Sequence, residues 1–150
     1  MNTALARFTA ARLSQWRSRF SRSSAGHLQL GARGEKLAAR HLRRQGFKVL
    51  YRNFRGRQGG EIDLVCRDGD TLVFVEVKTR TREDFGRPLE AVGAKKQRRI
   101  SLGALAWLRL LGNPDILFRF DIVEVTVVAD SPPKIELIRN AFQLSEPYLY

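Results

Sequence analysis

The segment from Gly59 to Arg80 reads GGEIDLVCRDGDTLVFVEVKTR and alternates apolar and polar residues like a β-hairpin. Its alternation places Asp63, Glu76 and Lys78 on one side of the predicted sheet, among β-branched residues that belong in a core. Two acids and a lysine in such a place are unfavourable for folding. The arrangement is typical of a site that holds a divalent cation against a phosphate.

The register of the hairpin determines whether the acids meet. The Asp68-Gly69 dipeptide predicts a two-residue turn, because glycine and aspartate tolerate positive φ. In that register Asp63 lies opposite Phe74 and is a diagonal neighbour of Glu76, about 7–8 Å away at the backbone. One predicted face carries Glu61, Asp63, Val65, Leu72, Phe74, Glu76 and Lys78. The other is wholly apolar and is predicted to be core: Ile62, Leu64, Cys66, Val73, Val75 and Val77.

Electrostatic repulsion limits how the two acids can be accommodated. Two negative charges about 5 Å apart repel by roughly 3 kcal/mol at an effective dielectric constant near 20. One acid can stay protonated, nearby cations can neutralise both, or a metal can bind. Lys78 offsets only part of the charge. A solvated face of salt bridges is the alternative, but Phe74 and the apolar reverse face favour a metal site, and Mg²⁺ suits carboxylate ligands combined with phosphate oxygens.

Composition indicates one domain and a polyanionic partner. The 150 residues carry a net charge of +12, concentrated in the first sixty residues, and 43% are hydrophobic. Basic surfaces bind nucleic acid through counterion release. No apolar run approaches the ~20 residues that span a bilayer, and there is no secretory signal, so we expect a cytoplasmic protein that does not bind membranes. The single cysteine, Cys66, is predicted to be a small core residue, and no Cys/His cluster suggests zinc.

Residues 1–26 differ from residues 27–150, which we predict to form the folded domain. The first segment is rich in arginine and serine and contains no acid. We interpret it as a flexible basic arm that touches nucleic acid nonspecifically. A transit peptide has a similar composition. Trp16 and Phe20 at helical spacing leave open a helix that docks on a partner or a membrane surface.

Two helices and five strands are expected around the acids. The first helix spans Leu28 to Gln45 and ends at Gly46, and the second runs from Pro88 to Leu111. Glu35 is a lone acid in the apolar arc of the first helix; it either pairs with a buried arginine or backbone amide, or reaches the same cation. Lys96 and Gln97 lie nearest the apolar stripe of the second helix, in a basic run that is either a solvated face or a phosphate-binding edge. The order predicts an α/β fold, with a mixed sheet flanked by helices.

The helical GxxGE, then GEIDLV, FVEVKTR and the KKQRR helix resemble the YraN family of small bacterial proteins between Leu30 and about Phe142. That family is similar to the restriction-endonuclease-like (PD-(D/E)XK) nucleases and to Holliday junction resolvases. The resemblance implies an αβββαβ core. It also implies that Asp63, Glu76, the Val77 carbonyl and Glu35 bind Mg²⁺ or Mn²⁺, and that Lys78 orients water and stabilises the phosphate.

The same resemblance implies a metal-dependent DNA endonuclease acting on branched or damaged DNA. Its expected DNA-binding residues are Arg33, Arg55, Arg57, Lys96 and Gln97. Resolvase-like relatives are often two-fold dimers, so a homodimer is a further expectation. Two alternatives stay open: a nucleic-acid-binding module that keeps the fold but does not cleave, and a basic RNA-associated scaffold, which leaves the acids unexplained.

Overall fold

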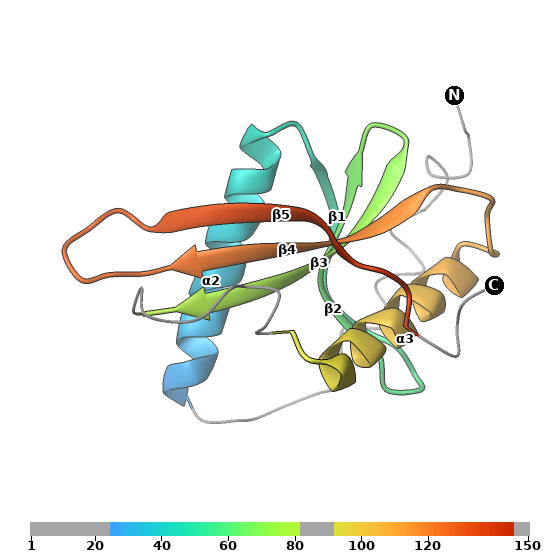
Figure 1. Ribbon diagram of the computed structural model, residues 1–150, viewed down its shortest axis with the longest axis horizontal. Coiled ribbons are helices and arrows are strands. Elements are labelled where there is room, and N and C mark those ends of the chain that lie inside the picture. Colours follow the sequence, from blue (N-terminus) through green and yellow to red (C-terminus); the bar gives the residue numbers. More distant parts are fainter. Residues whose placement is uncertain (1–24, 82–91, 146–150) are drawn as a thin grey trace.

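The computed structural model describes residues 25–81 and 92–145. Two helices and five strands follow one another in the order α-β-β-β-α-β-β (Figure 1). They are α2 (Ala25–Arg44), β1 (Lys48–Arg55), β2 (Glu61–Asp68), β3 (Thr71–Arg80), α3 (Ala94–Leu110), β4 (Phe118–Thr126) and β5 (Lys134–Phe142). The predicted α/β fold is confirmed: a mixed five-stranded sheet with a helix on each face, consistent with an αβββαβ core.

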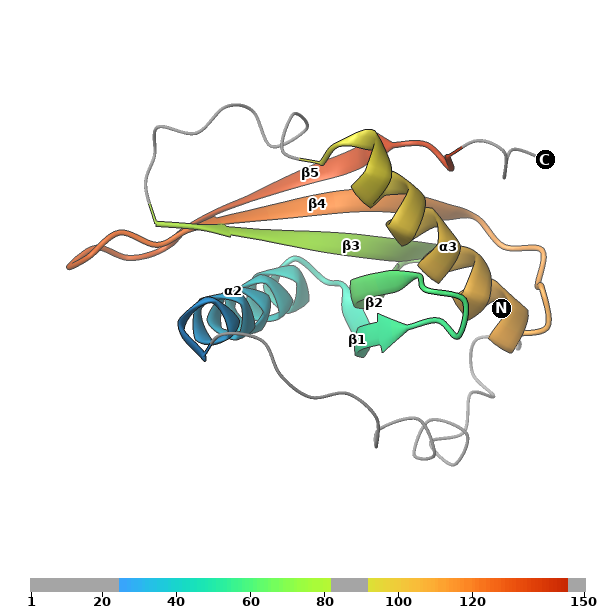
Figure 2. The ribbon, with the colours of Figure 1, turned by 90° about the horizontal axis from the view of Figure 1, so that it is seen from below.

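The strands lie in the sheet in chain order, β1-β2-β3-β4-β5. Neighbouring strands are antiparallel except β3 and β4, which are parallel. A parallel pair needs a crossover connection, and α3 supplies the helix of that crossover. Because β3 is the central strand, both of its faces are covered, by α2 on one side and by α3 on the other (Figure 2).

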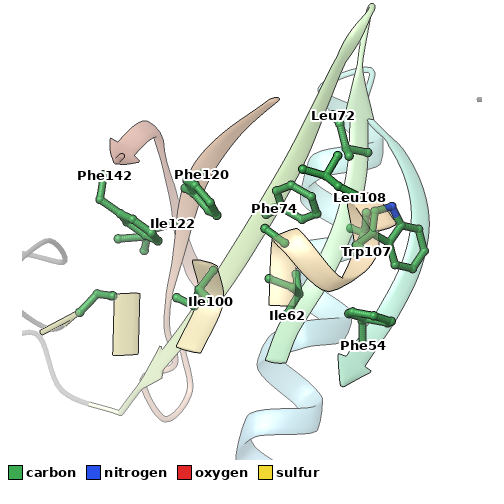
Figure 3. Close-up of a cluster of buried hydrophobic side chains, with 13 residues drawn as sticks. Phe54, Ile62, Leu72, Phe74, Ile100, Trp107, Leu108, Phe120, Ile122 and Phe142 are labelled. Atoms are coloured by element: carbon green, nitrogen blue, oxygen red, sulfur yellow. The ribbon is translucent and has the colours of Figure 1, made fainter. Parts of the chain in front are cut away.

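Two hydrophobic cores result, one on each face of the sheet. In the α3 core, Ile100 and Trp107 of α3 pack on Phe74 of β3 together with Phe54, Phe120 and Phe142 (Figure 3). In the α2 core, Ala38 and Leu42 pack on Leu64, Cys66, Val73 and Val75. The predicted apolar face is therefore core, and Cys66 is buried in it as expected. The face that carries the acids is also core over most of its length.

Both helices end where glycine allows a left-handed residue. Gly46 has φ of 92°, and the Phe47 amide donates to the Leu42 carbonyl, which is the Schellman arrangement. Gly112 has φ of 80°, and Asn113 donates to Leu108 in the same way. The predicted helix ends are thus confirmed. The predicted start of the second helix at Pro88 is wrong, because Gly93 is extended (φ −67°, ψ 165°) and α3 begins at Ala94.

The predicted hairpin register is wrong by two residues. Asp68 pairs with Thr71 and Val65 pairs with Phe74, so the turn residues are Gly69 and Asp70. Gly69 has φ of 59°, whereas Asp70 is not among the residues with positive φ. Glycine at the first central position is the preference of a type II′ turn, which the Asp68-Gly69 assignment would not provide. A shift of two residues does not by itself move a side chain to the other face of the sheet.

Ile62 is the exception to the predicted faces. It lies in the α3 core with Phe54, whereas Leu64 lies in the α2 core, so the alternation of β2 breaks at Asp63. The neighbouring strand explains the break. Phe54 pairs with Ile62 and Arg52 pairs with Leu64, and Asn53 between them has φ of 54°.

Some predictions fall outside the described residues. The predicted arm, residues 1–26, does so except for residues 25 and 26, which begin α2. The polar and charged composition of residues 79–87 predicts a mobile loop at the mouth of the site; residues 82–87 lie outside the described ranges, whereas residues 79 and 80 extend β3. Within the described ranges, neither helix is both long and apolar enough to cross a bilayer.

Candidate active site

The acidic pair lies where β2 and β3 stop pairing. The ladder between these strands ends at Leu64 and Val75, while β3 continues beside β4 as far as Arg80. Beyond the last pair, the side chain of Asp63 takes the place of a strand partner: its Oδ2 accepts a hydrogen bond of 2.8 Å from the Val77 amide. This point, where Asp63 faces Glu76 and Val77, is called the strand fork below.

Glu76 is the unusual group at the strand fork. Its side chain is only 4% exposed, and its Oε2 is buried without a hydrogen-bond partner among the described residues. Burial, and then the negative charge of Asp63, raises the pKa of Glu76 to about 8, against the opposing charges of Lys96 and Lys78. Buried polar atoms are nearly always paired. A buried acid that faces the Asp63 carboxylate and shares a hydrogen bond with it therefore indicates a position where a proton or a cation lies between the two groups.

Two lysines lie on the other side of the Glu76 carboxylate. Lys78 Nζ is 3.9 Å from Glu76 Oε1, and Lys96 Nζ is 3.2 Å from the same oxygen. The attraction of Glu76 and Glu61 raises the pKa of Lys96 although burial opposes it. The ammonium group of Lys96 therefore stays charged beside the acids. The structure brings together four of the predicted residues: Asp63, Glu76, Lys78 and Lys96.

Glu61 holds Lys96 in place, and sequence analysis did not assign it to the site. Its Oε1 is 2.6 Å from Lys96 Nζ, and its Oε2 is 2.9 Å from Arg99 Nη2. Although burial opposes the change, the hydrogen bond from Lys96 and the charges of Lys96 and Arg99 lower the pKa of Glu61. Lys96 and Arg99 are three residues apart and so share one side of α3. Two basic residues three positions apart on a helix that packs on the hairpin were the sequence feature that could have identified Glu61 as their partner.

Glu35 reaches the neighbourhood of the strand fork from α2. Its Oε2 accepts a 2.9 Å hydrogen bond from Asn53 Nδ2, so its partner is neither an arginine nor a backbone amide. Burial raises the pKa of Glu35, the Asn53 hydrogen bond opposes this, and the charge of Asp63 adds to it. Glu35 therefore lies near Asp63, although among the described residues no three acidic, histidine or cysteine side chains form one metal-holding group.

A glycine allows α2 to lie this close to β3. A Cβ on Gly34 would be 1.8 Å from Thr79 Oγ1. Only glycine therefore permits the approach that places its neighbour Glu35 beside the sheet. This gives a physical role to the second glycine of the helical GxxGE pattern, whereas a Cβ on Gly31 would meet nothing within 4 Å.

The predicted DNA-binding residues are distributed more widely. Arg33, Arg55 and Arg57 are exposed, and the positive charge of Arg55 acts on Glu61. Gln97 Nε2 donates to the Val92 carbonyl at 2.9 Å, so its amide supports the start of α3. Lys96 is engaged by the two acids. The three arginines lie at the surface, and Lys96 and Gln97 are bonded within the protein.

The donor set fits a hard divalent cation. Asp63 and Glu76 offer carboxylate oxygens, one of them unpaired, beside a site that already attracts the ammonium of Lys96. Mg²⁺ is commonly held by one or two carboxylates, with water or substrate oxygens completing its octahedron. Two carboxylates at the strand fork are therefore sufficient for Mg²⁺ or Mn²⁺.

A second charged cluster lies at the turn end of the hairpin and has a different character. Asp121 is fully buried and accepts two hydrogen bonds from Arg119 Nε, at 2.9 and 3.1 Å, and one from the Asn140 amide. Arg119 also bonds Asp68, which accepts from Arg139. The charges in this cluster are paired with one another, as expected of a structural ion-pair network.

The comparisons with known proteins agree in one family. Residues 34–125 match the model of the uncharacterised protein family UPF0102. The chain is 53% identical over 116 residues to the UPF0102 protein GSU0650 of Geobacter sulfurreducens, covering 77% of this chain and 90% of that protein. It is 49% identical over 118 residues to the UPF0102 protein RHA1_ro06551 of Rhodococcus jostii, covering 79% and 99%. The matched region contains Glu35, the whole hairpin, α3 and most of β4, and the chain belongs to the UPF0102 family.

Proposed function

We propose that this protein is a metal-dependent endonuclease that hydrolyses phosphodiester bonds of DNA, within the restriction-endonuclease-like (PD-(D/E)XK) superfamily that the YraN resemblance implies. The buried acid pair carries the proposal: Glu76 is 4% exposed, lies beside Asp63 and has a pKa raised to about 8. Burying two acids side by side lowers the folding stability of the protein. Such a group is characteristic of a functional site.

Asp63 and Glu76 would hold Mg²⁺ or Mn²⁺, with the Val77 carbonyl and Glu35 as the further ligands that the resemblance implies. The ion, when bound, supplies a Lewis acid for the phosphate and lowers the pKa of a coordinated water. Glu35 is hydrogen-bonded to Asn53, so a water between Glu35 and the site is the simpler arrangement.

The lysines would act on the negative charge of the phosphate. Lys78, 3.9 Å from Glu76, is near enough to the acids to orient water and to stabilise charge that builds on phosphate oxygens. Lys96 is shared by Glu61 and Glu76 in the described state. Lys96 would stay paired with Glu61 and could place its positive charge near a bound phosphate.

DNA is the substrate that the charge distribution favours. The net charge of +12 and the exposed arginines supply nonspecific attraction to phosphates. Phosphate contacts fix position without reading sequence. We therefore expect recognition of DNA structure, such as a branch, an end or a damaged position, in preference to a base sequence.

A nucleic-acid-binding module without cleavage is the second candidate, and one observation favours it. Lys96 already neutralises part of the charge of Glu76 and Glu61, and the acids near the strand fork do not form a group of three among the described residues. A fold that keeps these residues for stability alone would have this appearance.

Cleavage of branched, duplex and single-stranded DNA with Mg²⁺ or Mn²⁺ separates the two candidates. We expect cleavage by the wild-type chain, loss of cleavage in Glu76→Ala with DNA binding retained, and unchanged cleavage in Asp115→Ala, an exposed acid before β4. Salt-sensitive DNA binding without cleavage of any substrate would refute the enzyme and support the binding module.

A further inference from the structure

A cavity of about 350 Å³ lies between the loop that joins β1 to β2 and the C-terminal half of α3, and the acidic site does not use it. Figure 2 shows that loop beside the helix. The walls are mostly apolar, and Leu110 at the edge is 40% exposed. The cavity is lined by Phe54, Arg57 and Gln58 from β1 and the loop, and by Ala106, Arg109 and Leu110 from α3.

The cavity is preformed, because its loop is packed directly on the helix. A Cβ on Gly60 would be 2.1 Å from the backbone nitrogen of Gly103, and a Cβ on Gly56 would be 2.9 Å from Cβ of Ala106. Glycine at position 60 allows the two backbones to approach this closely, and glycine at position 56 leaves room for the Ala106 side chain. The loop is also closed on itself by the Gly56 amide, which donates to the Gly60 carbonyl at 2.8 Å. A ligand would therefore meet fixed walls.

The chemistry of the lining defines the ligand. Phe54, Ala106 and Leu110 offer apolar surface to a flat group, the Gln58 amide can both donate and accept at a polar edge, and two guanidinium groups lie at the rim. Arg57 and Arg109 favour an anion next to the flat group. The volume lies at the lower end of the ~300–1,000 Å³ typical of ligand sites. A single nucleobase with its phosphate has these properties.

The cavity also lies further along the helix that carries Lys96. Lys96 is at the strand fork, and Leu102 and Arg109 follow on the same helix, about 9 Å and about 20 Å further along its axis by helical rise. That span equals roughly three to six stacked nucleotides at about 3.4 Å each. Gly60, which lines the cavity, directly precedes Glu61, which holds Lys96.

We propose that this cavity binds an unpaired DNA base a few nucleotides from the acidic site, and so selects DNA that carries a bulge, branch or frayed end. The inference deepens the proposed function and rests on it for the choice of DNA as partner. A base taken out of the stack loses stacking energy, which is least for a base that is already unpaired. Stacking on an aromatic side chain, here Phe54, returns about 1–3 kcal/mol per base.

The test compares the affinities of the wild-type chain for two short duplexes in EDTA, one fully paired and one with a single unpaired base. Anisotropy of a labelled strand gives both dissociation constants, and their ratio is the readout. We expect the unpaired base to improve binding by at least about 5-fold, which is the lower end of one stacked base. A ratio of one in the wild-type chain would refute the proposal.

Two variants test whether the preference for an unpaired base comes from the cavity, and a third controls for the loss of positive charge. Ala106→Leu fills the cavity without altering charge and is expected to reduce the ratio to about one. Arg57→Ala/Arg109→Ala is expected to weaken binding of the unpaired base more than binding of the paired duplex. Arg40→Ala/Arg44→Ala removes the same charge from exposed positions of α2 and should weaken both equally. A ratio that survives the first two variants would also refute the proposal.

Folding is checked by circular dichroism and thermal melting. If Ala106→Leu does not fold, Leu110→Ala and Gln58→Ala take its place, since both remove cavity contacts from exposed positions. Because the assay measures binding without metal, its result is independent of cleavage. Discrimination without cleavage would support the base-binding cavity and refute the nuclease activity. Cleavage without discrimination would support the nuclease activity and refute the base-binding cavity.

Discussion

Replacing Glu76 with glutamine is expected to stabilise the metal-free protein at alkaline pH. Burial and the neighbouring Asp63 raise the pKa of Glu76 from 4.5 to about 8. Between these values the folded state keeps a proton that the unfolded state has released, so the free energy of unfolding falls as pH rises. Glutamine has nearly the same shape and no charge to lose, and its amide can donate to Asp63. The substitution therefore removes the fall in the free energy of unfolding that the wild-type chain shows as pH rises.

The size of the effect follows from the shift. One pKa unit corresponds to about 1.4 kcal/mol, so the full change would destabilise the wild-type chain by about 4 kcal/mol at pH 8. The variant also deprives Lys96 of an ionic partner, which offsets part of the gain. We therefore expect a gain of about 2–4 kcal/mol, which corresponds to about 5–10 °C in melting temperature.

Urea denaturation in EDTA at pH 5 and pH 8 measures both the gain and its pH dependence. Asp115→Asn makes the same chemical change at an exposed position and is expected to leave stability unchanged. Adding Mg²⁺ should stabilise the wild-type chain more than the variant, because binding to the folded state adds to its stability. Equal stabilities of Glu76→Gln and wild type at pH 8, or a gain that is as large at pH 5, would refute this account of Glu76.

Three further predictions concern the scaffold. Gly60→Ala should lower the free energy of unfolding by about 3 kcal/mol, because its Cβ would lie 2.1 Å from the backbone of α3. Gly31→Ala in α2 should raise it by about 0.5–1 kcal/mol. Chemical denaturation measures both variants, and equal effects would contradict this prediction. Asp121→Asn should cost about 3 kcal/mol by leaving the buried bonds of Arg119 incomplete, and an unchanged urea midpoint would contradict that role. Burial, with the charge of Asp121, raises the pKa of the Cys66 thiol to about 12, so a thiol reagent at pH 8 should react only as fast as the chain unfolds; rapid labelling of the native protein would contradict this.

The alternation of apolar and polar residues in the strands and the glycines at the helix ends made much of the fold predictable. The apolar positions of both strands of the hairpin predict a buried central sheet, and Gly46 and Gly112 predict the helix ends. The face of Glu76 was predicted because a strand has a period of two, which a register error of two residues does not disturb. The turn itself was misassigned because Asp68-Gly69 and Gly69-Asp70 are both acceptable turn pairs, and only the φ of the glycine distinguishes them.

What sequence could not supply were contacts between distant segments. The role of Glu61 depends on α3 crossing the hairpin, and the pairing of Glu35 depends on an asparagine in β1. Ile62 was assigned to the wrong face because the break in alternation arises from Asn53 on the adjacent strand. The pairing of Gln97 with Val92 likewise arises only because α3 begins at Ala94, later than the pattern indicates.

Asn53 has a second consequence, for the borders of the sheet. β1 and β5 are the two edge strands, and each contains an asparagine with positive φ: Asn53 at 54° and Asn140 at 51°. A left-handed residue interrupts the straight row of donors and acceptors that a neighbouring molecule would need to extend a sheet. Both borders are thus protected against edge-to-edge aggregation. The residue that bonds Glu35 therefore also helps to keep separate molecules from joining through their strands.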